Sequence, residues 1–217
     1  MEPKLLRVLY YLLSISAFKQ GDVIDSGAND GSSSVVLATM FPKHTVWAIE
    51  PLKSNVFEIY NKVKAYNVTN VKALRGGLGD VEGFGSYPSD LDMKKGSIRL
   101  QIMKSKNVRG NSSYPIFTID TLFSHKTLSF AHLDVEGSET MVLDGAVVTI
   151  LRDRPVFTVE THYENMKMEH DMVMKQISRL NYSAYKVNER CGARDCRNFV
   201  CVPNEWRIVN MLLKKYM

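Results

Sequence analysis

Short apolar runs alternate with longer segments of mixed character along most of this chain of 217 residues. The runs have the length of buried strands, and the longer segments carry apolar residues at helical spacing. Strands that alternate with helices form a largely parallel sheet covered on both faces. The pattern therefore predicts an α/β fold with a doubly wound, mostly parallel, Rossmann-like sheet. The predicted strands are the run from Asp22, Thr45–Glu50, Val68–Arg75, Leu128–Val135, Pro155–His162, Ser183–Val187 and Asn198–Val202.

The segments between these runs are predicted to be helices. A helix is expected to begin at Ser32, and a short strand-like stretch at Phe117 leads into a helix that Thr121 or Asp120 is able to cap. The chain shows no internal repeat and no low-complexity linker, so residues 1–217 are predicted to form one domain. The remaining predicted helices are Lys53–Tyr66, Ser138–Leu151, Met168–Leu180 and Glu205–Tyr216.

The first twenty residues are apolar enough to raise the question of a membrane segment. The run is too short for a span and Arg7 interrupts it, and no small-residue cleavage site of a signal peptide follows. We expect a helix over residues 4–18 that packs on the domain or contacts a partner, and no membrane span.

The turn after the first predicted strand indicates the kind of ligand. Gly27 and Gly31 let the backbone approach a ligand or adopt positive φ. The three-glycine fingerprint that cradles a pyrophosphate is incomplete, and Asp25 and Asp30 flank the turn. A ligand with cationic character and no phosphate, such as S-adenosylmethionine (SAM), fits this turn better. The alternative is an ordinary strand-to-helix turn.

Two further acids follow predicted strands. Glu50, followed by Pro51, ends the second strand at the spacing from the glycine turn where a carboxylate accepts hydrogen bonds from ribose hydroxyls. Asp80 follows Gly79 in a glycine-rich loop after the third strand, where it is placed to accept from an adenine amino group. The alternative for this loop is a turn capped by an aspartate.

Acids and a histidine gather at the ends of the fourth and fifth strands. Asp134 and Glu136 follow one strand, and Glu160 and His162 end the next. Methyl transfer to a hydroxyl needs a group that removes the acceptor's proton, and His162 is the first candidate, with Asp134 as the alternative. Asp134, Glu160 and His162 are also candidates for binding magnesium or manganese. Without a site, His162 would simply pair with a neighbouring glutamate, and Glu139 is expected at the positive end of the following helix.

Residues 81–111 break the alternation and are predicted to form a small antiparallel insertion near the site. Its basic run is either a solvated face or an edge that faces a sugar or an anion. The net charge of +5 and pI of about 9.0 are compatible with an acidic partner but do not establish one. Three cysteines spaced at fives fit no disulfide framework, which favours reduced thiols in a cytoplasmic compartment.

Several of these motifs, in this order, resemble those of the FkbM-type SAM-dependent methyltransferases, over roughly Gly21 to Val202. The motifs are Asp25–Gly31, Ala48–Pro51, Gly77–Asp80, Thr118–Leu122, Leu133–Glu139, Val142–Ala146 and Val159–His162. The resemblance implies the class I SAM methyltransferase fold and O-methylation, commonly of sugars or hydroxylated natural products. It implies that the turn Asp25, Gly27, Ala28, Asn29, Asp30 and Gly31 holds the methionine part of SAM. Glu50 would then bind the ribose, Asp80 would lie near the adenine, and Asp134 and Glu136 beside the methyl group.

Two positions depart from the family pattern. Ser26 stands where a small apolar residue is usual, and His132 stands where a lysine is common. The tail Cys191–Asn198 resembles eukaryotic and large-virus members. This likeness, to the methyltransferase domain of chlorovirus multidomain glycosyltransferases, implies a module linked to glycosyltransferase domains, a terminal rhamnose acceptor and the host cytoplasm. An RNA methyltransferase that uses the basic surface is the alternative, although no lysines accompany the strand-end acids as a ribose methylase requires.

Overall fold

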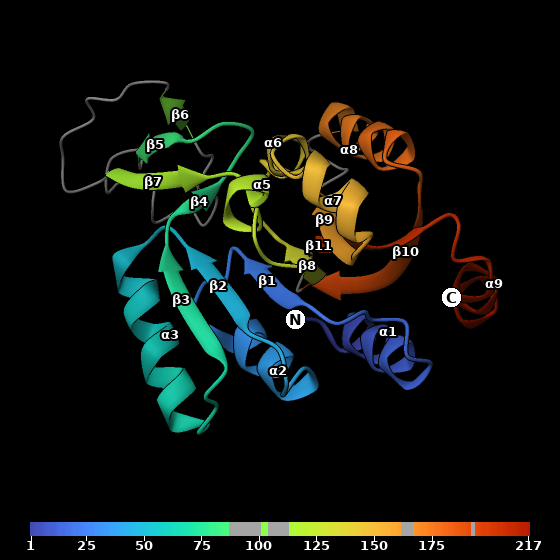
Figure 1. The fold of residues 1–217 in the computed structure, drawn as a ribbon, viewed down its shortest axis with the longest axis horizontal. Helices are drawn as coiled ribbons and strands as arrows, with labels where there is room; N and C mark the ends of the chain where they lie inside the picture. The colour runs from blue at the N-terminus through green and yellow to red at the C-terminus, as the bar shows by residue number, and fades with distance from the viewer. Residues whose placement is uncertain (87–100, 104–112, 162–166, 192–193) are drawn as a thin grey trace.

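The computed structural model describes residues 1–86, 101–103, 113–161, 167–191 and 194–217. Within these residues, one sheet has the strand order β10-β11-β9-β8-β1-β2-β3 (Figure 1). All neighbouring strands from β3 to β9 pair in parallel, and β11 runs antiparallel to both β9 and β10. The predicted doubly wound, mostly parallel α/β sheet is confirmed. Its strands are β1 (Asp22–Ser26), β2 (Val46–Glu50), β3 (Val71–Arg75), β8 (Leu128–Leu133), β9 (Val156–Thr161), β10 (Tyr182–Cys191) and β11 (Arg194–Pro203).

The order of the strands places a crevice between β1 and β8. From β1 the chain continues to β2 and β3 on one side, and it later returns to form β8 and β9 on the other side. Strands β8 and β9 are buried at every position, as central strands of a parallel sheet are. Ligands of open α/β sheets bind at such a reversal of strand order, outside the carboxyl ends of the strands.

Helices cover both faces of this sheet (Figure 1). Alternate residues of a strand face opposite sides, so Val23 packs with Leu9 and Leu37 on one face while Ile24 packs with Val142 and Ile150 on the other. The first face carries α1 (Pro3–Ser14), α2 (Ser32–Met40), α3 (Lys53–Ala65) and α9 (Arg207–Tyr216). The second carries α5 (Ile119–Leu122), α6 (Glu139–Asp144), α7 (Val147–Asp153) and α8 (Lys167–Arg179).

The N-terminal helix is shorter than predicted. It begins at Pro3 and ends at Ser14, and Ser16 has a positive φ of 54° that is incompatible with a continuing helix. Leu5, Leu9 and Leu12 are fully buried, so the helix packs on the domain. Over the described part of the chain, no helix has both the length and the apolar content needed to cross a membrane.

The predicted helix over 138–151 is instead two helices, α6 and α7, separated at Gly145. A Cβ atom at Gly145 would lie 2.0 Å from the carbonyl oxygen of Gly79, so this position packs directly against the loop after β4. Asp120 accepts hydrogen bonds from the backbone N–H groups of Val148 and Thr149 (3.1 and 2.7 Å) and thereby starts α7. The break therefore comes from long-range contacts that helix periodicity does not show.

Two other predictions need correction. Helix α5 is capped by Thr118, whose Oγ1 accepts a hydrogen bond from the Thr121 N–H at 3.0 Å, and not by Thr121 or Asp120. The two predicted C-terminal strands extend into the long hairpin of β10 and β11, which is paired from Tyr182↔Pro203 to Cys191↔Arg194. Residues at the tip of this hairpin, 192 and 193, lie outside the described part of the chain.

A second sheet lies above the carboxyl ends of β2 and β3 (Figure 1). Its order is β4-β7-β5-β6, with β5 antiparallel to both β6 and β7. Its strands are β4 (Gly77–Leu78), β5 (Gly83–Ser86), β6 (Gln101–Met103) and β7 (Ser113–Phe117). The expected insertion at 81–111 contributes β5 and β6 to this sheet, while the basic run falls outside the described residues, at Lys94, Lys95, Arg99, Lys104, Lys106 and Arg109.

Candidate functional site

The turn after β1 is held in a left-handed backbone conformation at three positions. Gly27, Asn29 and Gly31 have φ values of 79°, 48° and 81°. The Gly27 N–H donates to the carbonyl oxygen of Ile49 at 3.0 Å. A Cβ atom at Gly27 would lie 1.7 Å from the carbonyl oxygen of Asp134. Only glycine fits here, and the turn lies between the tips of β2 and β8.

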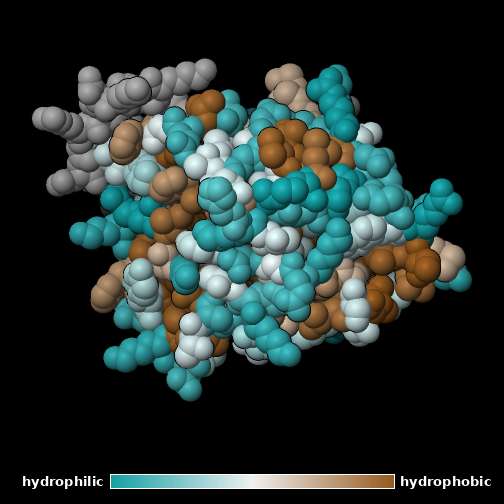
Figure 2. Space-filling view, viewed as in Figure 1, coloured by the Kyte–Doolittle hydropathy of each residue, from teal (hydrophilic) through white to brown (hydrophobic). Residues whose placement is uncertain are grey.

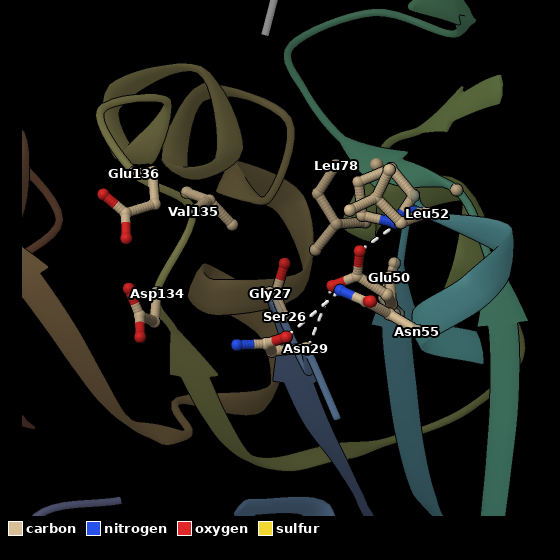
Figure 3. Close-up of a pocket in the computed structure, with 14 residues that line it drawn as sticks. Ser26, Gly27, Asn29, Glu50, Leu52, Asn55, Leu78, Asp134, Val135 and Glu136 are labelled. Carbon is tan, nitrogen blue, oxygen red and sulfur yellow. Dashed lines mark hydrogen bonds between the residues drawn. The ribbon is translucent and has the colours of Figure 1, made fainter. Parts of the chain in front are cut away.

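A pocket of about 300 Å³ opens beside this turn (Figure 3). It lies at the reversal of strand order, where the fold predicts ligand binding. Glu50 lies at one end, and Asp134 with Glu136 lies at the other (Figure 3). The pocket is lined by Ser26, Gly27, Asn29, Ile49, Glu50, Pro51, Leu52, Asn55, Gly76, Gly77, Leu78, Asp134, Val135 and Glu136.

Glu50 is the last residue of β2 and is held by its neighbours. Its Oε2 accepts from the Asn29 N–H and its Oε1 from the Leu52 N–H, both at 2.9 Å. Burial raises the pKa of Glu50, and the hydrogen bonds from Leu52 and Asn29, together with the amide of Asn55, oppose this rise. The carboxylate is thus oriented at the pocket wall as a hydrogen-bond acceptor.

Asn55 is a further residue of the pocket wall, and no motif of the sequence predicts it. Its Nδ2 donates to Oδ1 of Asn29 at 3.1 Å, and its side chain helps to oppose the rise in the pKa of Glu50. Asn55 stands five residues after Glu50, in the first turn of α3. A polar residue at the start of a helix carries no signal of its own, because only the packing of α3 beside the β1 turn brings it to the pocket.

Two acids occupy the opposite end of the pocket. The Asp134 N–H donates to the Ser26 carbonyl oxygen at 3.1 Å, which ties this end to β1. Burial and the nearby carboxylates of Glu160 and Glu136 raise the pKa of Asp134 well above its usual range. Glu136 adopts a positive φ of 55°, an uncommon conformation for a residue with a side chain. The local field therefore favours a cationic group or a proton donor.

Three predicted residues lie near Asp134 or at the pocket rim. Glu160 is the last residue but one of β9 and is buried, and it contributes to the charge around Asp134 without lining the pocket. Glu139 stands in the first turn of α6, as predicted, and its Oε1 accepts from the Gly137 N–H at 3.1 Å. Pro51 lines the pocket directly after Glu50.

Other predicted residues of the first turn lie beneath the pocket or face away from it. Asp25 is buried and accepts a hydrogen bond from the Ser34 hydroxyl, and burial raises its pKa to about 6 against that bond. Ala28 is buried against α3. Asp30 is exposed and pairs with Lys62; desolvation would raise its pKa, but the hydrogen bonds from Lys62 and Ser32 together lower it to about 2. Gly31 packs against Ile59. These residues shape the turn from outside the pocket.

Asp80 does not reach the pocket in this structure. After β3 the chain turns into β4, which pairs with β7, and the Gly79 N–H donates to the Phe117 carbonyl oxygen at 3.0 Å. Asp80 follows as an exposed residue. The part of the pocket wall that Asp80 was expected to form consists instead of Gly76, Gly77 and Leu78.

His162 falls outside the described residues, so its predicted roles as a base and as a metal ligand remain predictions. Across the described ranges, no group of three His, Cys, Asp or Glu side chains is placed to hold a metal ion. His132, which stands where the family commonly has lysine, is buried, and its Nδ1 lies 2.7 Å from the Thr158 hydroxyl. Burial lowers its pKa to about 4, so it places no positive charge here at neutral pH.

The charge of the pocket is one-sided. Glu50, Asp134 and Glu136 contribute three carboxyl groups, and its lining contains no lysine, arginine or histidine among the residues described. A pyrophosphate would place two more negative charges here without a partner. The pocket suits a ligand that brings hydroxyl donors to one end and positive charge to the other.

The fold and the position of this pocket are those of the class I SAM-dependent methyltransferases. The profile of the FkbM methyltransferase domain matches residues 25–184, and the chain belongs to this family. None of the curated proteins compared with the chain matches it.

Solved structures agree with this assignment at the level of the fold. The methyltransferase FkbM from Methylobacillus flagellatus has a TM-score of 0.59 at 20% identity, and the match covers 83% of this chain and 43% of that one. The chain thus spans less than half of that protein. A putative O-methyltransferase from Klebsiella pneumoniae (TM-score 0.57, 10% identity) is covered over 81% of its length and 94% of this chain. A putative rRNA-methylase from Clostridium thermocellum has a TM-score of 0.53 at 12% identity, and the match covers 94% of this chain and 96% of that one.

Proposed function

We propose that this chain transfers the methyl group of SAM to a hydroxyl group of a sugar or glycan. The observation that carries the proposal is the one-sided charge of the pocket. Glu50 at the tip of β2 is an acceptor for the two ribose hydroxyls, and Asp134 with Glu136 offers negative charge for the sulfonium end. Gly27 lines the pocket between these ends and has no side chain that would keep a ligand from its backbone.

Methyl transfer is an in-line displacement in which SAM supplies an electrophilic methyl group. The acceptor oxygen forms a bond to the methyl carbon as the carbon–sulfur bond breaks, and the sulfonium becomes a neutral thioether. The proton of the hydroxyl must pass to a base held close to that oxygen. We propose Asp134 for this role because it lines the pocket, and its raised pKa makes it a stronger base than an ordinary aspartate. His162 is the other candidate.

The choice of a sugar hydroxyl rests on the family resemblance and on the pocket together. The described pocket lining contains no basic side chain to hold a nucleic-acid backbone. A polyol brings hydroxyl donors, which suit the acids at the Asp134 end. Terminal rhamnose is the first acceptor to test.

Calorimetric titration with S-adenosylhomocysteine (SAH), with NADH as the control, tests the cofactor. Micromolar binding of SAH alone is the expected result, and binding of NADH alone would remove the proposal. The acceptor is then tested by transfer of a tritiated methyl group from SAM to rhamnose-terminated glycans and to RNA. We expect label in the glycan, and label confined to RNA would assign the chain to nucleic-acid methylation instead.

A further inference from the structure

Asn55 joins three separate elements at the Glu50 end of the pocket. It stands in the first turn of α3 and hydrogen-bonds Asn29 in the turn after β1, and the Asn29 N–H in turn donates to Glu50 at the tip of β2. Figure 3 shows the three side chains meeting at this wall, with Leu52 beside them. No other side chain of α3 lines the pocket within the part of the helix described.

The contacts on Glu50 define how its carboxylate is held. Two backbone amides, of Asn29 and Leu52, donate to different oxygens of the Glu50 carboxylate, both at 2.9 Å. An ionised carboxylate has about four lone-pair sites, so these two donors leave acceptor capacity for a ligand. Asn55 supports this arrangement through Asn29, since its Nδ2 donates to Oδ1 of the residue whose N–H donates to Oε2 of Glu50.

We propose that Asn55 is a positioning residue for the cofactor, which fixes the Glu50 carboxylate and the Asn29 turn in the arrangement that accepts a ribose diol. This inference rests on the proposed function, because it assumes that Glu50 receives the ribose hydroxyls. Asparagine suits the position for a physical reason. Its amide N–H₂ donates to the side-chain Oδ1 of Asn29 and carries no charge, whereas an aspartate of the same size could not donate and would add a like charge beside Glu50.

The charged and titratable groups around Glu50 set the pH range in which Asn55 matters. Burial and, as a smaller cause, the charge of Asp25 on β1 raise the pKa of Glu50. Burial and then the charge of Glu50 raise the pKa of Tyr114 on β7. Arg75 on β3 is the register partner of Glu50, but its guanidinium donates to the Ser113 carbonyl oxygen. The amide of Asn55 opposes the rise in the pKa of Glu50. Loss of Asn55 therefore lets Glu50 take up a proton at a higher pH.

The test is calorimetric titration with SAH from pH 5 to pH 8 on the wild type, Asn55→Ala and Asn55→Asp. The matched control is Asn61→Ala, an exposed asparagine of the same helix. We expect Asn55→Ala to weaken binding at pH 7 by about tenfold, as loss of one hydrogen bond at the pocket wall does. Its affinity should also begin to fall at a higher pH than in the wild type, and Asn55→Asp should bind more weakly than Asn55→Ala.

Each outcome decides the inference. Asn61→Ala should match the wild type in affinity and in pH profile. If Asn55→Asp binds SAH as tightly as the wild type does, only the shape of the side chain at position 55 matters. This result would overturn the positioning role. A loss in Asn55→Ala that is equal at every pH, with a lowered melting temperature, would likewise assign Asn55 to structure only. No binding of SAH by the wild type would remove the proposed function itself, whereas unchanged binding in both Asn55 variants removes this inference alone.

Discussion

Gly27 and Asp134 approach so closely that a single Cβ atom on Gly27 would lie 1.7 Å from the carbonyl oxygen of Asp134. The contact joins the turn after β1 to the tip of β8, which are the two strands that flank the reversal of the sheet order. The backbones of the two turns that border the pocket are thus in direct contact at this point.

Substitution of Gly27 by alanine should therefore destabilise the protein and distort the pocket. The positive φ and the overlap together should lower the free energy of unfolding by about 2–4 kcal/mol. Gly83→Ala is the control, because a Cβ atom there meets nothing within 4 Å. Urea unfolding measures both variants, and equal stability of the two would show that the turn relaxes freely.

Glu50→Gln should weaken SAH binding while the fold remains intact. Glutamine keeps the size of the side chain but removes the charge and one acceptor, so we expect a loss of about 10- to 100-fold in affinity, typical of hydrogen bonds to a charged group. Glu58→Gln, on the exposed side of α3, is the control and should bind SAH normally. Calorimetric titration with SAH measures both variants. Equal SAH affinities of Glu50→Gln and the wild type would mean that the ribose hydroxyls bind elsewhere.

Asp134→Asn should lower turnover with little change in SAH affinity. Loss of a general base costs about 10²–10⁴ in rate. Since the pKa of Asp134 is raised, wild-type turnover should decline on acidification at a higher pH than an ordinary aspartate would give. Methyl transfer to the acceptor found in the glycan screen provides the rate. Full turnover in this variant, together with a collapse in His162→Ala, would assign the base to His162.

His132 should make the protein sensitive to acid. Burial and the N-terminal ammonium lower its pKa from 6.5 to about 4, so the folded state disfavours the protonated ring. The neutral ring of His132 contributes fully to the free energy of unfolding above pH 6.5. This contribution, about 3 kcal/mol, is lost as the pH falls through 4.

The variant His132→Asn should lose less stability than the wild type between pH 6.5 and pH 4. Asparagine can still contact Thr158 but does not titrate. The exposed His125→Asn is the control and should follow the wild type. Unfolding free energies measured across this range give the comparison, and parallel curves for all three proteins would contradict a buried neutral His132.

Much of the fold could be predicted from local patterns. Every residue of β8 and β9 is buried, and such strands are visible in the sequence as short, mostly apolar runs. Glu50 ends its strand where the pattern places it, because the apolar run stops there. Local pattern and tertiary structure agree wherever a strand is central in the sheet.

The sequence did not reveal features that depend on long-range contacts. Asn55 reaches the pocket only because α3 packs beside the turn after β1, and Gly145 ends α6 because it packs on Gly79. Asp80 follows the third strand as expected, yet the pairing of β4 with β7 takes it away from the pocket. Each of these outcomes is decided by an element far away in the sequence.

The left-handed residues in the two turns beside the pocket have a consequence for ligand binding. Gly27, Asn29 and Gly31 in one turn, and Glu136 with Gly137 in the other, hold strained or glycine-dependent backbone conformations in the folded chain itself. The energetic cost of these conformations is met when the protein folds, so the pocket is preorganised before a ligand binds. Little binding free energy is then lost in ordering the two turns. We therefore expect the free and bound forms to differ mainly in side-chain rotamers around the cleft.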